Sequence, residues 1–80
     1  MYMTGWCPYC QRAGALLAQK SVSVTQVNVD DDAKFRQEMI ARSGRRSVPQ
    51  IFIGDQHVGG CDDLFALDGS GELDRLLEGA

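Results

Sequence analysis

The apolar positions of the chain alternate between runs typical of strands and spacings typical of helices. Apolar and β-branched residues dominate residues 24–29 and 48–53, which predicts two strands. Apolar residues at helical spacing predict helices over residues 8–20 and 33–43. Weaker patterns predict further strands at residues 2–4 and 56–58, and further helices at residues 61–67 and 71–78.

This order of elements defines a fold class. A strand–helix–strand start implies two parallel strands joined by a right-handed crossover. The Gly54-Asp55 turn between the last two strands implies an antiparallel hairpin. The order strand–helix–strand–helix–strand–strand–helix therefore predicts an α/β domain, with a mixed four-stranded sheet and helices on both faces.

Residue types at the predicted helix ends support these boundaries. Pro8 suits the first turn of a helix, because its fixed backbone angle is helical and its missing N–H would have no partner there. Asp31 or Asp32 can cap the next helix, and Gly44 can end it.

Length and composition exclude several classes of protein. Eighty residues form one small domain, residues 1–80, and 44% hydrophobic with 24% charged residues is ordinary for a folded protein. A net charge of −3 argues against nucleic-acid binding, and no apolar run approaches the roughly 20 residues of a membrane span. The first residues lack the basic and apolar stretches of a secretory signal. We therefore expect a cytoplasmic monomer with no nucleic-acid or membrane partner.

The strongest chemical signal is the sequence Cys7-Pro8-Tyr9-Cys10, which follows a predicted strand and opens a predicted helix. A C-x-x-C motif in this context is typical of a redox-active dithiol. Backbone N–H groups and the dipole at a helix start stabilise a thiolate, which is the nucleophilic form of cysteine. Cys10 lies within bridging range, so we expect Cys7 to attack a disulfide and Cys10 to resolve the product.

Two structural interpretations of the same motif remain. The pair could be half of a zinc site, but a structural zinc takes four ligands and only Cys61 and His57 remain as candidates. The pair could also be an inert disulfide, although closing so short a loop adds little stability. The redox interpretation is favoured, and we expect no metal.

Two further elements accompany the dithiol. Val48-Pro49 opens a predicted strand; it is either an ordinary strand-edge proline or a cis peptide that presents the Val48 backbone to an extended substrate. The run 59–62, Gly-Gly-Cys-Asp, precedes a helix whose N-terminus can bind a carboxylate, while Asp62 can receive an ammonium. The alternative for this run is a plain turn with an acidic N-cap.

The three elements, in this order and spacing, resemble the glutaredoxin family over nearly the whole chain, and bacterial glutaredoxins of the glutaredoxin-3 group in particular. The resemblance implies a thioredoxin-like fold and a glutathione-dependent thiol–disulfide oxidoreductase with a role in electron transport and cell redox homeostasis. Glutathione would be the co-substrate. Disulfide-bonded and glutathionylated client proteins would be the other partners.

The resemblance also implies a glutathione site. Pro49 matches the family's cis-proline, and Val48 the residue whose backbone pairs with the cysteinyl part of glutathione. Arg36 falls where a residue for the glycyl carboxylate is expected, within a basic stretch that also holds Arg42, Arg45 and Arg46. The complete implied set is Tyr9, Arg36, Val48, Pro49, Gly60, Cys61 and Asp62.

Three positions depart from the family pattern or stay open. Thr4 stands where a basic residue is common, which places more weight on the helix start in activating Cys7. Trp6 replaces a smaller residue and could shield the thiolate, contact partners or pack. Cys61 is either a small buried residue or a redox-sensitive third thiol.

Two rival functions share this fold. One is a redoxin reduced by thioredoxin reductase, and the glutathione-binding elements argue against it. The other is a non-enzymatic iron–sulfur cluster carrier that uses Cys7 with external glutathione; Pro8 and the second thiol, Cys10, argue against that role.

Overall fold

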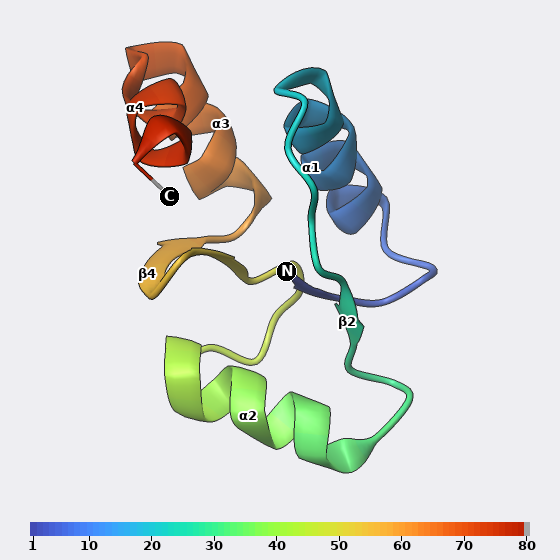
Figure 1. The fold of residues 1–80 in the computed structure, drawn as a ribbon. Coiled ribbons are helices and arrows are strands. Elements are labelled where there is room, and N and C mark those ends of the chain that lie inside the picture. Colours follow the sequence, from blue (N-terminus) through green and yellow to red (C-terminus); the bar gives the residue numbers. More distant parts are fainter. Residues whose placement is uncertain (80) are drawn as a thin grey trace.

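The computed structural model describes residues 1–79, and its elements follow in the predicted order (Figure 1). They are β1 (Tyr2–Met3), α1 (Pro8–Gln19), β2 (Val27–Asn28), α2 (Ala33–Ser43), β3 (Ile51–Ile53), β4 (Gln56–Gly59), α3 (Cys61–Ser70) and α4 (Glu72–Glu78).

The strands form two ladders that meet at one bridge. β1 pairs in parallel with β2, and β3 pairs antiparallel with β4. Tyr2 and Gln50 exchange two backbone hydrogen bonds of 2.9 and 3.0 Å, which join the ladders in the order β2-β1-β3-β4. The predicted mixed arrangement of four strands is therefore confirmed.

Three predicted strands are shorter in the structure, and the first, expected over residues 2–4, loses one residue. The strand expected over residues 24–29 is reduced to Val27–Asn28, because β1 offers it only two partner residues. The strand expected over residues 48–53 begins at Ile51, since the chain turns at Val48-Pro49, where the peptide bond is cis.

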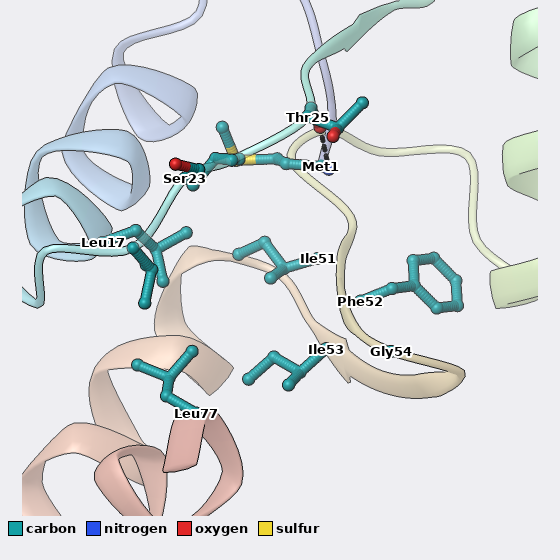
Figure 2. A pocket seen from close by; sticks show the side chains of 11 residues that line it. Met1, Leu17, Ser23, Thr25, Ile51, Phe52, Ile53, Gly54 and Leu77 are labelled. Atoms are coloured by element: carbon teal, nitrogen blue, oxygen red, sulfur yellow. Dashed lines mark hydrogen bonds between the residues drawn. The ribbon is translucent and has the colours of Figure 1, made fainter. Parts of the chain in front are cut away.

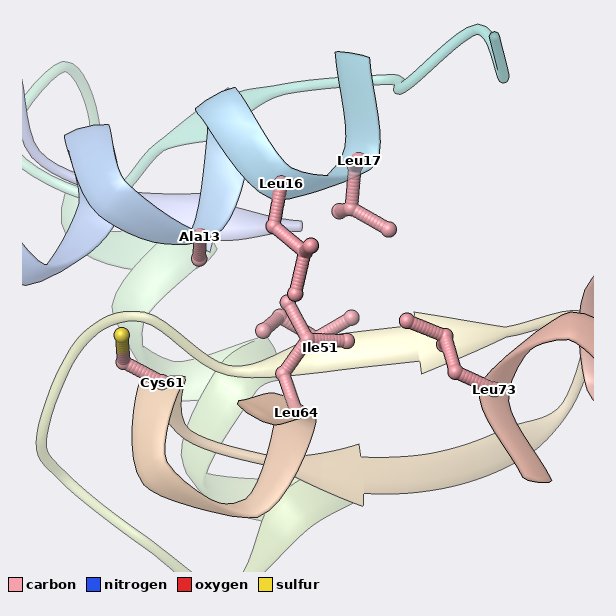
Figure 3. Close-up of a cluster of buried hydrophobic side chains, with 7 residues drawn as sticks. All are labelled: Ala13, Leu16, Leu17, Ile51, Cys61, Leu64 and Leu73. Atoms are coloured by element: carbon pink, nitrogen blue, oxygen red, sulfur yellow. The ribbon is translucent and has the colours of Figure 1, made fainter. Parts of the chain in front are cut away.

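Helices cover both faces of the strands, as predicted (Figure 1). On one face, Figure 3 shows side chains of α1, α3 and α4 gathered around Ile51. On the other, Met39 of α2 packs with Tyr2 and Val29. Burying a large apolar side chain contributes roughly 1.5–3 kcal/mol, so these two clusters hold the helices on the strands. The first cluster consists of Ala13, Leu16, Leu17, Ile51, Cys61, Leu64 and Leu73.

The ends of α2 match the residues that predicted them. Asp32 caps the helix by accepting a 2.9 Å hydrogen bond from the Lys34 amide, and Gly44 ends it with a φ of 71°. α3 continues to Ser70, beyond the predicted end at residue 67. Within residues 1–79, no helix is long and apolar enough to cross a membrane.

Candidate active site

Cys7 occupies the N-cap of α1, where the chain turns from β1 into the helix. Its backbone is extended, with φ −84° and ψ 117°, and Pro8 takes the first helical position. The Cys7 sulfur accepts a hydrogen bond of 3.4 Å from the Cys10 amide. An N–H that points at the sulfur stabilises negative charge on it, and the helix dipole acts in the same direction. The predicted placement of Cys7 is confirmed.

Cys10 lies in the first turn of α1, beneath Cys7, and is 3% exposed. Burial raises the pKa of the Cys10 thiol to about 11, and the neighbouring Cys7 side chain adds to this rise. The backbone of Thr4, itself buried, opposes it in part. Cys10 is therefore a protonated thiol at neutral pH.

The loop before β3 carries the second predicted element. The Cys7 sulfur lies 3.8 Å from the Val48 carbonyl oxygen, next to the cis Val48-Pro49 bond. Gln50 is fully buried and its side-chain amide donates to the Ser47 carbonyl at 2.9 Å. Because the Gln50 backbone also pairs with β1, this loop is fixed beside the thiol.

A groove of about 240 Å³ runs between this loop and the start of α3. It brings together six of the seven residues that the resemblance implies for glutathione. These six are Tyr9, Val48, Pro49, Gly60, Cys61 and Asp62; Arg45, Ser47 and Asp63 complete the lining.

The seventh implied residue, Arg36, lies elsewhere. Its guanidinium contacts the Asp30 carboxylate at 3.2 Å and the Arg46 carbonyl at 3.5 Å, and Arg36 is not among the residues that line the groove. Arg45 is the arginine of the basic stretch that reaches it. The sequence indicated the stretch, but which arginine faces the groove depends on where α2 ends.

The start of α3 is organised around Asp63 rather than Asp62. Asp63 accepts 2.9 Å hydrogen bonds from the Gly60 amide and from the Arg45 guanidinium. The Gly60 N–H, followed by Arg45, holds the pKa of the Asp63 carboxyl below its usual value. Gly59 has a φ of 120°, and a Cβ there would collide with the Asp63 carboxylate, so only glycine fits. Asp62 is exposed and lines the groove.

Cys61 belongs both to the groove and to the packed core. It is 6% exposed, and burial raises the pKa of its thiol, with Arg12 opposing the rise. Cys7, Cys10 and Cys61 are all free thiols. Within residues 1–79, no three or more His, Cys, Asp or Glu side chains are grouped to hold a metal ion.

A larger cavity, of about 380 Å³, lies away from the thiols between residues 22–25, β3 and Leu77 (Figure 2). The described residues that line it are apolar residues, a serine, a threonine and a glycine, and none of them has a charged side chain. The Met1 amino group closes one side with a 2.7 Å hydrogen bond to the Thr25 carbonyl. The cavity offers no group for thiol chemistry.

The fold and the site together define a class: a thioredoxin-like domain with a dithiol at a helix start and a groove beside it. The model of the family described as Glutaredoxin matches residues 1–58. "Glutaredoxin 3" of Escherichia coli (strain K12) is 58% identical over 78 residues, covering 98% of this chain and 94% of that one.

Solved structures agree with this relationship. The solution structure of a glutaredoxin from Brucella melitensis is 53% identical, with a TM-score of 0.83, covering 95% of this chain and 83% of that one. The crystal structure of a buckwheat glutaredoxin–glutathione complex has a TM-score of 0.88 at 28% identity, covering 96% of this chain and 73% of that one. The chain belongs to the glutaredoxin family, whose members are glutathione-dependent thiol–disulfide oxidoreductases.

The family assignment confirms the predicted fold and the predicted reductase activity. Four residues at or beside the groove were not predicted as site residues from the sequence: Arg45, Ser47, Gln50 and Asp63. The available signals were a polar residue inside an apolar strand for Gln50, and an acidic residue in a first helical turn for Asp63.

Proposed function

We propose that Cys7 is the nucleophile and Cys10 the resolving thiol in the reduction of protein–glutathione mixed disulfides and protein disulfides. The observation that supports this division is the asymmetry of the two sulfurs. The Cys7 sulfur accepts a backbone N–H and lies 3.8 Å from the carbonyl oxygen of Val48, a residue that lines the groove. Both cysteines are buried, Cys7 at 4% and Cys10 at 3% exposed, so the asymmetry lies in their surroundings, which raise the pKa of Cys10 to about 11.

With a mixed disulfide, the Cys7 thiolate attacks the glutathione sulfur in line with the disulfide bond. The Cys7–glutathione bond forms, the old disulfide breaks, and the client leaves as a thiolate that takes a proton from water. A glutathione thiolate then attacks the glutathione sulfur on Cys7. Glutathione disulfide leaves and Cys7 returns as a thiolate, so the net reaction oxidises one free glutathione thiol and restores one client thiol.

With a protein disulfide, Cys7 first forms a mixed disulfide with the client. Cys10 loses its proton and attacks the Cys7 sulfur, which releases the client as a dithiol and leaves a Cys7–Cys10 disulfide. Two glutathione molecules then reduce this disulfide, and glutathione disulfide is the product. The burial that raises the pKa of Cys10 makes it a weak competitor for external disulfides.

The groove offers charges complementary to those of glutathione. Glutathione carries two carboxylates and one ammonium. The groove offers the Arg45 guanidinium, the N-terminus of α3 and the exposed Asp62 carboxylate, with Tyr9 and the Val48 backbone next to the sulfur. Arg45 is better placed than Arg36 to meet a carboxylate of glutathione because Arg45 lines the groove. Each of the two already pairs with a carboxylate of the chain, Arg45 with Asp63 and Arg36 with Asp30.

The expected setting is the cytoplasm, where glutathione keeps thiols reduced, and the expected clients are disulfide-bonded or glutathionylated proteins. We further expect the chain to act as a monomer in cell redox homeostasis, without a bound metal.

A glutathione-coupled assay on the mixed disulfide of glutathione with free cysteine tests this proposal. Cys7→Ser should lose all turnover above background. Cys10→Ser, its matched control, should retain turnover of the mixed disulfide but lose reduction of a protein disulfide. Retained mixed-disulfide turnover in Cys7→Ser would contradict the proposal.

A further inference from the structure

Trp6 immediately precedes the nucleophile and takes no part in the chemistry described above. Its side chain is 70% exposed, and it belongs to neither hydrophobic cluster of the described chain. Large exposed aromatic residues beside a reactive group are typical of binding surfaces.

The Trp6 ring is nonetheless held in place. Its Nε1–H donates a 3.0 Å hydrogen bond to one carboxylate oxygen of Asp30. The other oxygen of Asp30 accepts a 3.2 Å hydrogen bond from Arg36, whose guanidinium also reaches the Arg46 carbonyl. The Asp30 amide is tied to the Asn28 side chain at 2.9 Å. A ring fixed before binding loses less entropy when a partner covers it.

The Trp6–Asp30 pair and the glutathione groove lie on different sides of Cys7. Trp6 follows β1 and Asp30 follows β2, whereas the groove is built from the loop before β3 and the start of α3. β1 lies between β2 and Gln50. If the glutathione half of a mixed disulfide fills the groove, its other half stays outside the groove, where Trp6, the residue before Cys7, is exposed.

The acidic run beside Trp6 indicates what kind of partner this surface favours. Asp30 is paired with Arg36, and Asp32 caps α2. Asp31 is exposed and forms no ion pair within residues 1–79. An exposed indole face with a nearby free carboxylate attracts a cationic side chain.

We propose that Trp6 is a specificity-determining residue that contacts the client half of a mixed disulfide and favours clients with a basic side chain next to the glutathionylated cysteine. Asp30 is a positioning residue that acts through Trp6. This inference rests on the proposed function, because it requires glutathione to occupy the groove.

Three substrates separate this role from catalysis in general. Two are glutathionylated peptides of equal length whose cysteine is flanked by lysines in one and by glutamates in the other; the third is the mixed disulfide of glutathione with free cysteine. The wild type should show a lower KM for the lysine peptide than for the glutamate peptide. Trp6→Ala should raise the KM for the lysine peptide about threefold to fivefold, and leave kcat and turnover of the small disulfide within about twofold.

Two further variants give controls. Asp30→Ala should raise the KM for the lysine peptide by about twofold. Trp6 is the chain's single tryptophan, and a neutral quencher should reduce its fluorescence more strongly in Asp30→Ala than in the wild type. Phe65→Ala removes another exposed aromatic side chain, on α3, and should leave all three substrates unchanged.

Three results would overturn the inference. Equal KM values of the wild type for the two peptides would refute the preference for basic clients. An equal loss with Trp6→Ala on the small disulfide and on the peptides would place the role of Trp6 at the thiolate instead. Unchanged quenching in Asp30→Ala would refute the positioning role. In each of these cases the proposed function still stands if the wild type turns over the mixed disulfide of glutathione with free cysteine. If the wild type does not turn over that small disulfide, the proposed function itself is wrong.

Discussion

The two sides of Cys7 are built in different ways. On the groove side, Cys61 and Leu64 belong to the larger core cluster, and Asp63 is tied to both Gly60 and Arg45. On the other side, Trp6 is exposed and is held through Asp30 by surface contacts alone. The groove side is thus continuous with the packed interior, whereas the Trp6 side is attached to its surface.

This difference matches the two halves of the proposed substrate. Glutathione is the same molecule in every turnover, so a rigid and preorganised site can serve it. Client proteins vary in sequence and shape, and a single exposed ring with few contacts to its own chain can bind many of them. Substitutions of matched residues on the two sides test this difference.

The largest expected contrast is in stability. Leu64 is fully buried, so Leu64→Ala should lower the free energy of unfolding by about 2–5 kcal/mol. Trp6→Ala should lower it by less than about 1 kcal/mol, because it removes one exposed hydrogen bond and no packing. Urea unfolding followed by circular dichroism measures both. A loss in Trp6→Ala as large as that in Leu64→Ala would show that Trp6 is a structural residue.

A smaller contrast is expected between two arginines. Arg45→Ala should raise the KM for glutathione about tenfold, because it removes a charged partner from the groove. Arg36→Ala should change the same KM by less than about twofold with the small disulfide as substrate. Steady-state kinetics at varied glutathione concentration decides between them. The opposite result would restore the glycyl-carboxylate role that the sequence implied for Arg36.

The smallest effect concerns the pH dependence of the groove. The folded-state pKa of Asp63 is lowered, first by the Gly60 N–H and then by Arg45. The stability it contributes is therefore present above the unfolded pKa of 3.8, and is lost as the pH falls through the folded value. Since this carboxylate is partly exposed, we expect less than about 1 kcal/mol.

Urea unfolding at neutral pH and at about pH 3 tests this expectation. Asp63→Asn should flatten the dependence of stability on pH over this range. Arg45→Ala should flatten it only in part, since the Gly60 N–H remains. Identical pH dependence in the wild type and Asp63→Asn would contradict the assigned stabilisation.

Local features of the sequence predicted the parts of the structure that local physics determines. Cys7 before Pro8 placed the thiol at a helix start, and Asp32 and Gly44 fixed the ends of α2. Strand lengths were overestimated because a strand extends only as far as its neighbour does, and β1 spans two residues.

The sequence predicted those parts of the site that are contiguous in the chain, and missed contacts between residues that are distant in the chain. Motifs identified the Val48-Pro49 loop and the start of α3, because each is contiguous in sequence. Arg45 follows the end of α2 and Asp63 lies in α3, and the two form an ion pair at the groove. No local sequence pattern predicts that contact. Gln50 is similar, since its role is to join the loop to β1.

The central claim is that Cys7 is the one thiol of this chain that accepts glutathione. The most direct test is to incubate Cys10→Ser with glutathione disulfide, digest the protein and map the adduct by mass spectrometry. Cys7 should exchange with glutathione disulfide, releasing one glutathione thiolate and retaining the other half, so a single adduct should map to Cys7. An adduct on Cys61, or no adduct on Cys7, would contradict the claim.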